Sequence, residues 1–197
     1  MRRVSVVGTS GAGKSTLAAG LARVLDADLL ELDSVFHQPG WVPLGREEFR
    51  RRVAAAVAGE RWVIDGNYTS QVKDLVWACA DTVVWLDLPR RTVMRRIIWR
   101  SFLRAAARTE LWNGNRERWR NFLSMDKEES VIAWAWQTHA ATRTKLEAAR
   151  ADQGNTHLEF VRLTSPAAVR RFLRSAAPSP TSGAPASEAP TSGVDQL

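Results

Sequence analysis

The residues best suited to chemistry in this sequence lie near its start, in the run Gly8-Thr9-Ser10-Gly11-Ala12-Gly13-Lys14-Ser15. The run fits the pattern G-x-x-x-x-G-K-[ST] at every fixed position. Glycines allow backbone shapes closed to other residues, so successive N–H groups can point into one concavity at the start of a helix and bind phosphate. Lys14 adds a positive charge for the β- and γ-phosphates, and the Ser15 hydroxyl can bind Mg²⁺. The run therefore predicts a site for a nucleoside triphosphate.

Three aspartates follow short apolar runs, at positions 33, 65 and 87. Ligands of an open parallel sheet bind beyond the carboxyl ends of its strands. Asp65 ends the run Trp62-Val63-Ile64-Asp65, the form of a Walker B element, and is predicted to hold Mg²⁺ through its water shell or else to cap the next turn. Asp33 could orient or deprotonate an acceptor hydroxyl, or serve only as an N-cap. Asp87 is expected to be structural, as a cap of the helix that follows it.

An arginine-rich stretch runs from residue 88 to 109 and contains no acidic residue. Four of its arginines recur at a spacing of four, on one helical face: Arg96, Arg100, Arg104 and Arg108. Like charges at this spacing repel by about 0.2–0.5 kcal/mol per pair, so an anion would stabilise them. Phosphate oxygens match the arginine fork, although a solvated basic face is the plainer alternative. Arg143, on a later helix, is a further candidate for phosphate contact.

The elements that must position these residues alternate along the chain. Strands are expected at 3–7, 28–32, 61–65, 82–86 and 157–163, and helices at 14–25, 47–58, 90–108, 128–150 and 166–175. This alternation predicts an α/β fold with a parallel sheet and helices on both faces. The polar, glycine-containing stretch 109–120 is either a mobile cover over the phosphates or an ordinary loop.

Length and composition limit the number of domains and the class of protein. The 197 residues suit one domain, and 45% hydrophobic with 25% charged residues excludes collagen-like, coiled-coil and wholly disordered chains. No apolar run could span a membrane or serve as a signal peptide, and Cys79 has no partner for a disulfide, so a cytoplasmic protein without a membrane partner is expected. Residues 1–175 are predicted to form the domain, and 176–197, rich in Pro, Ser and Ala, a disordered tail.

The net charge is +7, and the tail contains acidic residues but no basic ones, so the domain itself is more basic still. Such a surface favours anionic partners, which include nucleotides, phosphorylated metabolites and nucleic acid. Charge alone does not choose among them, and no helix-turn-helix or zinc-finger pattern is present in the sequence.

The assembled motifs resemble the P-loop nucleoside monophosphate kinase superfamily, and within it the adenylate-kinase-related topology modulation proteins. The resemblance is carried by Gly8–Thr16, Leu32-Asp33 with Pro39-Gly40-Trp41, Trp62–Tyr68, Leu86–Arg90, and the R-x-x-x-R pair Arg96 and Arg100. It implies a P-loop NTPase core with five parallel strands in the order 2-3-1-4-5 and a helical lid. It also implies that ATP is held by Gly8, Thr9, Ser10, Gly11, Ala12, Gly13, Lys14, Ser15 and Thr16.

One departure concerns the acceptor. Adenylate kinases place D-G-[FY]-P-R after the third strand, and its arginine grips the AMP phosphate. Here Asp65-Gly66 is followed by Asn67-Tyr68-Thr69, so this sequence lacks that arginine.

The sequence as a whole predicts an ATP- and Mg²⁺-dependent phosphotransferase that acts on a nucleotide or a small anionic or hydroxyl metabolite. Ser15 and Asp65 are expected at the metal, and the expected catalytic residues are Lys14, Asp33, Arg96, Arg100 and Arg143. The alternative is a nucleotide-dependent, DNA-binding protein without kinase activity.

Overall fold

The computed structural model describes residues 1–68, 70–107, 112–114 and 131–177. Most of the stretch expected to form a cover, and the tail from residue 178, lie outside these ranges. The side chains of Arg104 and Arg108 are also outside the described set.

The centre of the fold is a parallel sheet of five strands in the order β2-β3-β1-β4-β5, which confirms the predicted α/β class and the order that the resemblance implied. Its strands are β1 (Arg3–Gly8), β2 (Asp28–Glu31), β3 (Trp62–Asp65), β4 (Thr82–Leu86) and β5 (Glu159–Leu163). The inner strands are apolar and buried on both faces, as expected where helices cover a parallel sheet. The register pairs Val6 with Asp65 and Gly8 with Leu86, so the ends of β1, β3 and β4 lie together.

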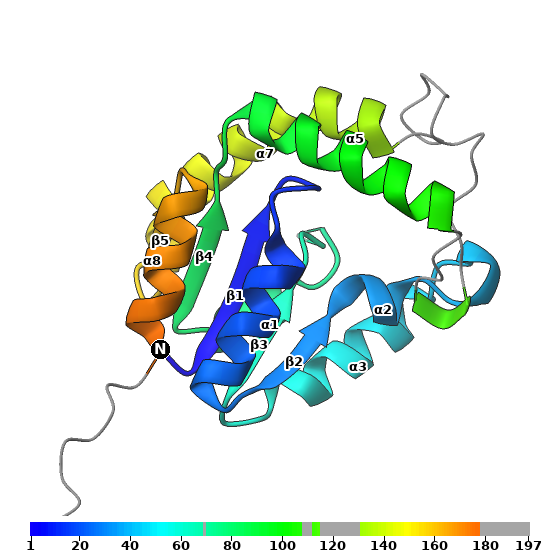
Figure 1. Ribbon diagram of the computed structural model, residues 1–197. Coiled ribbons are helices and arrows are strands. Elements are labelled where there is room, and N and C mark those ends of the chain that lie inside the picture. Colours follow the sequence, from blue (N-terminus) through cyan, green and yellow to red (C-terminus); the bar gives the residue numbers. More distant parts are fainter. Residues whose placement is uncertain (69, 108–111, 115–130, 178–197) are drawn as a thin grey trace, which may run out of the picture.

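Helices cover both faces of the sheet (Figure 1). One buried cluster joins the sheet to α1 (Lys14–Leu25) and α8 (Pro166–Ala176) through side chains such as Leu17 and Leu21. The other joins it to α3 (Arg46–Val57), α4 (Lys73–Cys79) and α7 (Val131–Ala151), and includes Phe49, Trp77 and Leu146. These two layers confirm the predicted architecture.

Local signals explain the start of α8. The N-cap Ser165 accepts a hydrogen bond from the Ala168 N–H, and Pro166 occupies the first turn of α8, as predicted. That helix reaches Ala176, one residue beyond the expected domain boundary. The helices α2 (Leu32–Phe36) and α4 were not predicted, because five and seven residues are too few for a periodic pattern. Asp33 therefore lies in the first turn of α2, directly after β2, which ends at Glu31.

The helix α5 (Arg90–Ala107) crosses above the carboxyl ends of the strands (Figure 1). Beyond it, the short helix η2 (Trp112–Gly114) lies against α2 and against η1 (Pro39–Trp41). The Asn113 side chain makes this contact by donating to the Ser34 carbonyl at 3.0 Å and the His37 carbonyl at 2.6 Å. The chain thus passes from α5, which follows β4, to the side of the sheet where β2 lies. None of the helices in the described ranges is long and apolar enough to cross a membrane.

Candidate functional site

The phosphate-binding loop joins β1 to α1, and its glycines are required by its geometry. Gly8 has φ 144°, and a Cβ there would lie 2.6 Å from the Leu86 carbonyl oxygen. Gly11 has φ 77°, and a Cβ there would collide with the Ile97 side chain of α5. Both positions combine a left-handed backbone with a close neighbour, so only glycine fits. The sequence motif therefore has the loop conformation that it predicted.

A side chain that sequence reasoning missed holds the start of this loop. The side-chain Nδ2 of Asn67 donates to the Gly8 carbonyl at 2.6 Å, and the Gly8 N–H donates to the side-chain Oδ1 of Asn67 at 3.0 Å. Asn67 follows β3, which pairs with β1, so the two residues meet although 59 positions separate them. The sequence indicated only a turn at this asparagine, and its place directly after an apolar strand was the available signal.

Lys14 and Ser15, at the start of α1, face the carboxylate at the end of β3. The Ser15 hydroxyl donates to Asp65 Oδ2 at 2.6 Å, and Lys14 Nζ donates to the Thr9 carbonyl at 3.4 Å. Desolvation lowers the pKa of Lys14, while the negative charges of Asp65 and Asp33 act in the opposite direction. Burial also disfavours the charged form of Asp65, which is 6% exposed, and so raises its pKa. The structure thus brings the expected lysine, serine and aspartate together.

The same residues fit a bound Mg²⁺ ion. Asp65 Oδ1 is buried and has no hydrogen-bond partner among the described residues, while Oδ2 holds the Ser15 hydroxyl. An orphaned buried carboxylate oxygen is costly unless a ligand, such as a cation or its water shell, satisfies it. Hydroxyl and carboxylate oxygens are also the donors that Mg²⁺ prefers.

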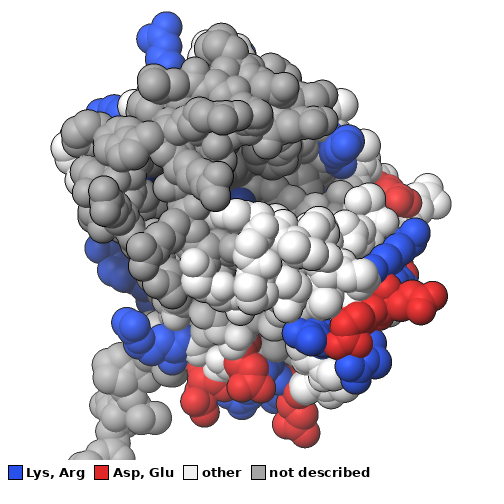
Figure 2. Space-filling view, turned by 90° about the vertical axis from the view of Figure 1, so that its right-hand side faces the viewer, with Lys and Arg blue, Asp and Glu red and all other residues white. Residues whose placement is uncertain are grey.

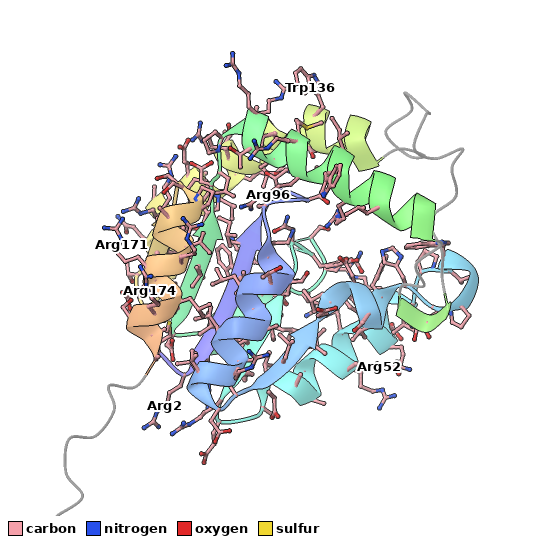
Figure 3. All side chains as sticks on the ribbon, viewed as in Figure 1. Arg2, Arg52, Arg96, Trp136, Arg171 and Arg174 are labelled. Atoms are coloured by element: carbon pink, nitrogen blue, oxygen red, sulfur yellow. The ribbon has the colours of Figure 1, made fainter. Side chains whose placement is uncertain are left out.

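Arginines of α5 reach the phosphate loop from above. Arg96 Nη1 donates to the Ala12 carbonyl at 2.9 Å, and Figure 3 shows the Arg96 side chain between α5 and the end of β1. The positive charge of Arg100 contributes to the lowering of the Lys14 pKa, so it too lies within electrostatic reach of the loop. The structure therefore brings this predicted pair of arginines to the place where phosphates would bind.

Asp33 accepts a hydrogen bond from a tyrosine that the sequence did not single out for chemistry. The Tyr68 hydroxyl donates to Asp33 Oδ1 at 2.6 Å and lies 3.4 Å from His37 Nε2. Burial, followed by the charge of Asp33, raises the pKa of Tyr68, so the tyrosine remains a donor at neutral pH. Since Tyr68 follows Asn67, one short segment after β3 positions both the phosphate loop and Asp33.

Asp87 and Arg143 have a different arrangement from the one predicted. The Asp87 side chain, 3% exposed, accepts hydrogen bonds from Arg143 of α7 and Arg162 of β5, at shortest distances of 2.6 and 2.5 Å. Burial alone would raise the pKa of Asp87, but these two arginines lower it. Asp87 was expected to be structural, as a cap of α5, and its described ion pairs give it the structural role of tying α7 to the sheet. Arg143 is engaged by this carboxylate, so its contact with phosphate stays a prediction.

Comparison with known proteins finds solved structures with a similar fold. No family model and no curated protein matches the chain in sequence. Among solved structures, the shikimate kinase from Acinetobacter baumannii is similar with a TM-score of 0.51 and 16% identity over 89% of this chain and 90% of that one. A gluconokinase from Sinorhizobium meliloti 1021 follows with a TM-score of 0.46 and 17% identity over 89% of each chain.

The likeness to the shikimate kinase concerns the fold. Together with the strand order and the phosphate loop, this likeness shows that the chain has the fold of the P-loop kinases. The narrower resemblance to topology modulation proteins is not supported by the solved structures and remains a prediction.

Proposed function

We propose that this protein is an ATP-dependent phosphotransferase that moves the γ-phosphoryl group of ATP to a hydroxyl group of a small molecule. The observation that carries the proposal is the convergence of three groups at the carboxyl ends of β1, β2 and β3. These are the loop lysine Lys14, the Ser15–Asp65 pair and the tyrosine-bound Asp33. The charges of Asp33 and Asp65 both act on Lys14, as expected where an acceptor and a phosphate must meet.

The phosphate half of the site would bind and hold the nucleotide. The loop N–H groups and the Lys14 ammonium would bind the β- and γ-phosphates at the start of α1. Ser15 and Asp65 would hold Mg²⁺, which when bound neutralises charge on the phosphates. Arg96 and Arg100 would stabilise the charge of the transferring group, because guanidinium forks match phosphoryl oxygens.

The acceptor half would orient and deprotonate the hydroxyl. As the acceptor oxygen forms its bond to the γ-phosphorus and the bond to ADP breaks, the hydroxyl proton passes to Asp33. The Tyr68 hydroxyl donates to Asp33 Oδ1, which leaves Oδ2 to meet the acceptor.

The DNA-binding alternative finds less support in the geometry. It rests on the basic charge of the chain, and the best-placed arginine of the basic helix, Arg96, donates to the Ala12 carbonyl of the phosphate loop. A guanidinium held there serves a nucleotide in the loop more directly than a duplex on the surface.

The substitution Asp33→Asn tests the proposal. Transfer from labelled ATP to the best acceptor of a hydroxyl-compound screen is expected to fall by about 10²–10⁴-fold, because asparagine keeps the hydrogen bond to Tyr68 but is not a base. ATP affinity should stay close to that of the wild type. The matched control is Asp28→Asn, which changes an exposed aspartate at the opposite end of β2. Wild-type turnover in Asp33→Asn would reject the catalytic role.

A further inference from the structure

We propose that the phosphoryl acceptor is a hydroxyl compound without negative charge, bound between Asp33 and a wall of aromatic rings. The aromatic wall consists of Phe36, His37, Trp41 and Tyr68. This inference rests on the proposed phosphotransfer and names the class of its substrate.

The charges at the carboxyl end of the sheet fall into two groups. The positive charges come from the phosphate loop and α5, as Lys14, Arg96 and Arg100. The negative charges come from the β2 and β3 side, where Glu31 lies opposite Asp65 in the register of the two strands and Asp33 follows in the first turn of α2. A triphosphate is attracted to the first group, while an anionic acceptor would meet carboxylates in the second.

The segment that follows Asp33 offers no cation to offset this. Residues 34–44 contain no Lys, Arg, Asp or Glu, and His37 is their only titratable side chain. The contact from η2 is made by Asn113, a neutral amide. Figure 2 views the molecule from the side of α2 and α3, where the central part of the described surface is largely uncharged. Burying a carboxylate or phosphate without a paired cation is costly, so among the described residues the segment 34–44 disfavours an anionic acceptor.

The aromatic wall is built from ring contacts along the same segment. Ring centroids lie 4.9 Å apart for Phe36 and Tyr68, 5.2 Å for Phe36 and His37, and 5.3 Å for His37 and Trp41. Such edge and tilted contacts order the rings relative to one another. The wall therefore offers apolar faces next to a carboxylate, which suits a ring compound with hydroxyl groups on its edges.

The backbone keeps Trp41 in this wall at a conformational cost. Trp41 has φ 63°, a left-handed conformation that is rare for so bulky a residue. The turn is held by hydrogen bonds from the Gln38 N–H to the Val42 carbonyl at 2.8 Å and from the Leu44 N–H to the Phe36 carbonyl at 2.7 Å. Strained residues of this kind cluster at ligand-binding sites. With 39% of its surface exposed, Trp41 can still contact a ligand.

Polar groups on the wall match hydroxyls. Tyr68 occupies Asp33 Oδ1, so an acceptor hydroxyl can donate to Oδ2. His37 Nδ1 is buried without a hydrogen-bond partner among the described residues, and a second hydroxyl of the acceptor would satisfy it once the ring shifts toward the ligand.

The experiment compares acceptors in pairs that differ in charge. The full-length protein is incubated with Mg²⁺, labelled ATP and either glucose or gluconate, glycerol or glycerate, and thymidine or thymidine monophosphate. Within the pairs that are phosphorylated, the uncharged member is expected to have at least a tenfold higher kcat/KM. A preference for the anionic member would overturn this inference while leaving phosphotransfer intact.

A second variant tests the electrostatic reason directly. Val42 lies beside Trp41, is 57% exposed, and belongs neither to the wall nor to the catalytic groups. Val42→Arg is expected to raise the anionic-to-neutral ratio of kcat/KM by about tenfold, whereas the size-matched control Val42→Gln leaves it unchanged; an unchanged ratio in Val42→Arg contradicts the inference. If no acceptor is phosphorylated although ATP still raises the melting temperature, the proposed function fails and this inference fails with it.

Discussion

The contact between Asn67 and the phosphate loop leads to the sharpest prediction. The substitution Asn67→Ala removes hydrogen bonds from both backbone groups of Gly8, a buried residue. Each buried polar group left without a partner costs about 1–3 kcal/mol, and entering water recovers a part of this. We therefore expect the free energy of unfolding to fall by about 2–4 kcal/mol. For a chain of this size that lowers the melting temperature by about 5–15 °C.

The same substitution should weaken nucleotide binding. Gly8 begins the loop, so its loss of position misplaces the N–H groups that would bind phosphate. A tenfold loss of ATP affinity corresponds to about 1.4 kcal/mol, and we expect at least that. Thermal unfolding with and without Mg-ATP, together with calorimetric titration, measures both effects.

The matched control is Asn155→Ala. Its amide donates to the Ala149 carbonyl at 2.7 Å near the end of α7, at the opposite end of the sheet from the loop. This control should lose about 1 kcal/mol of stability and keep its ATP affinity. If Asn67→Ala binds ATP like the wild type and loses no more stability than the control, then the asparagine does not organise the loop.

Three further predictions concern charged groups of the site. ATP at a hundred times its dissociation constant should stabilise the wild type by about 2.7 kcal/mol, and Lys14→Ala should lose most of this shift in a thermal-unfolding assay; an equal shift in both would rule out the lysine's role. Burial raises the folded-state pKa of Asp65, so the ionised carboxylate lowers the stability of the fold at any pH above that pKa. Asp65→Asn should therefore melt at a higher temperature than the wild type at pH 7, while binding Mg-ATP more weakly. The folded-state pKa of Asp87 is lowered, so its contribution is present above about pH 4 and is lost as the pH falls through the folded value. In Arg143→Gln the free energy of unfolding, measured with urea, should therefore fall less steeply as the pH is lowered below about 4. The same pH dependence in the variant and the wild type would contradict the ion pair.

Local sequence was enough to predict the phosphate loop and most of the elements around it. The glycine spacing of Gly8–Ser15 determines a loop in which Cβ atoms would collide, and the apolar runs and helical repeats depend on neighbours within a few residues. Asp65 was found for the same reason, since it ends a strand whose apolar run is visible in the sequence. The short helices α2 and α4 were not predicted, because five to seven residues cover at most two helical turns and show no clear apolar repeat.

The partners of the site residues were decided only by the tertiary structure. Asn67 meets Gly8, and Tyr68 meets Asp33, because β3 lies between β1 and β2 in the sheet. Asp87 binds Arg143 and Arg162, 56 and 75 positions away, since β5 and α7 pack beside β4. Nothing in the local pattern of a strand specifies which strand becomes its neighbour, because that choice depends on burying the faces of the whole sheet at once. The order of the strands is therefore what converts separate motifs into one candidate site.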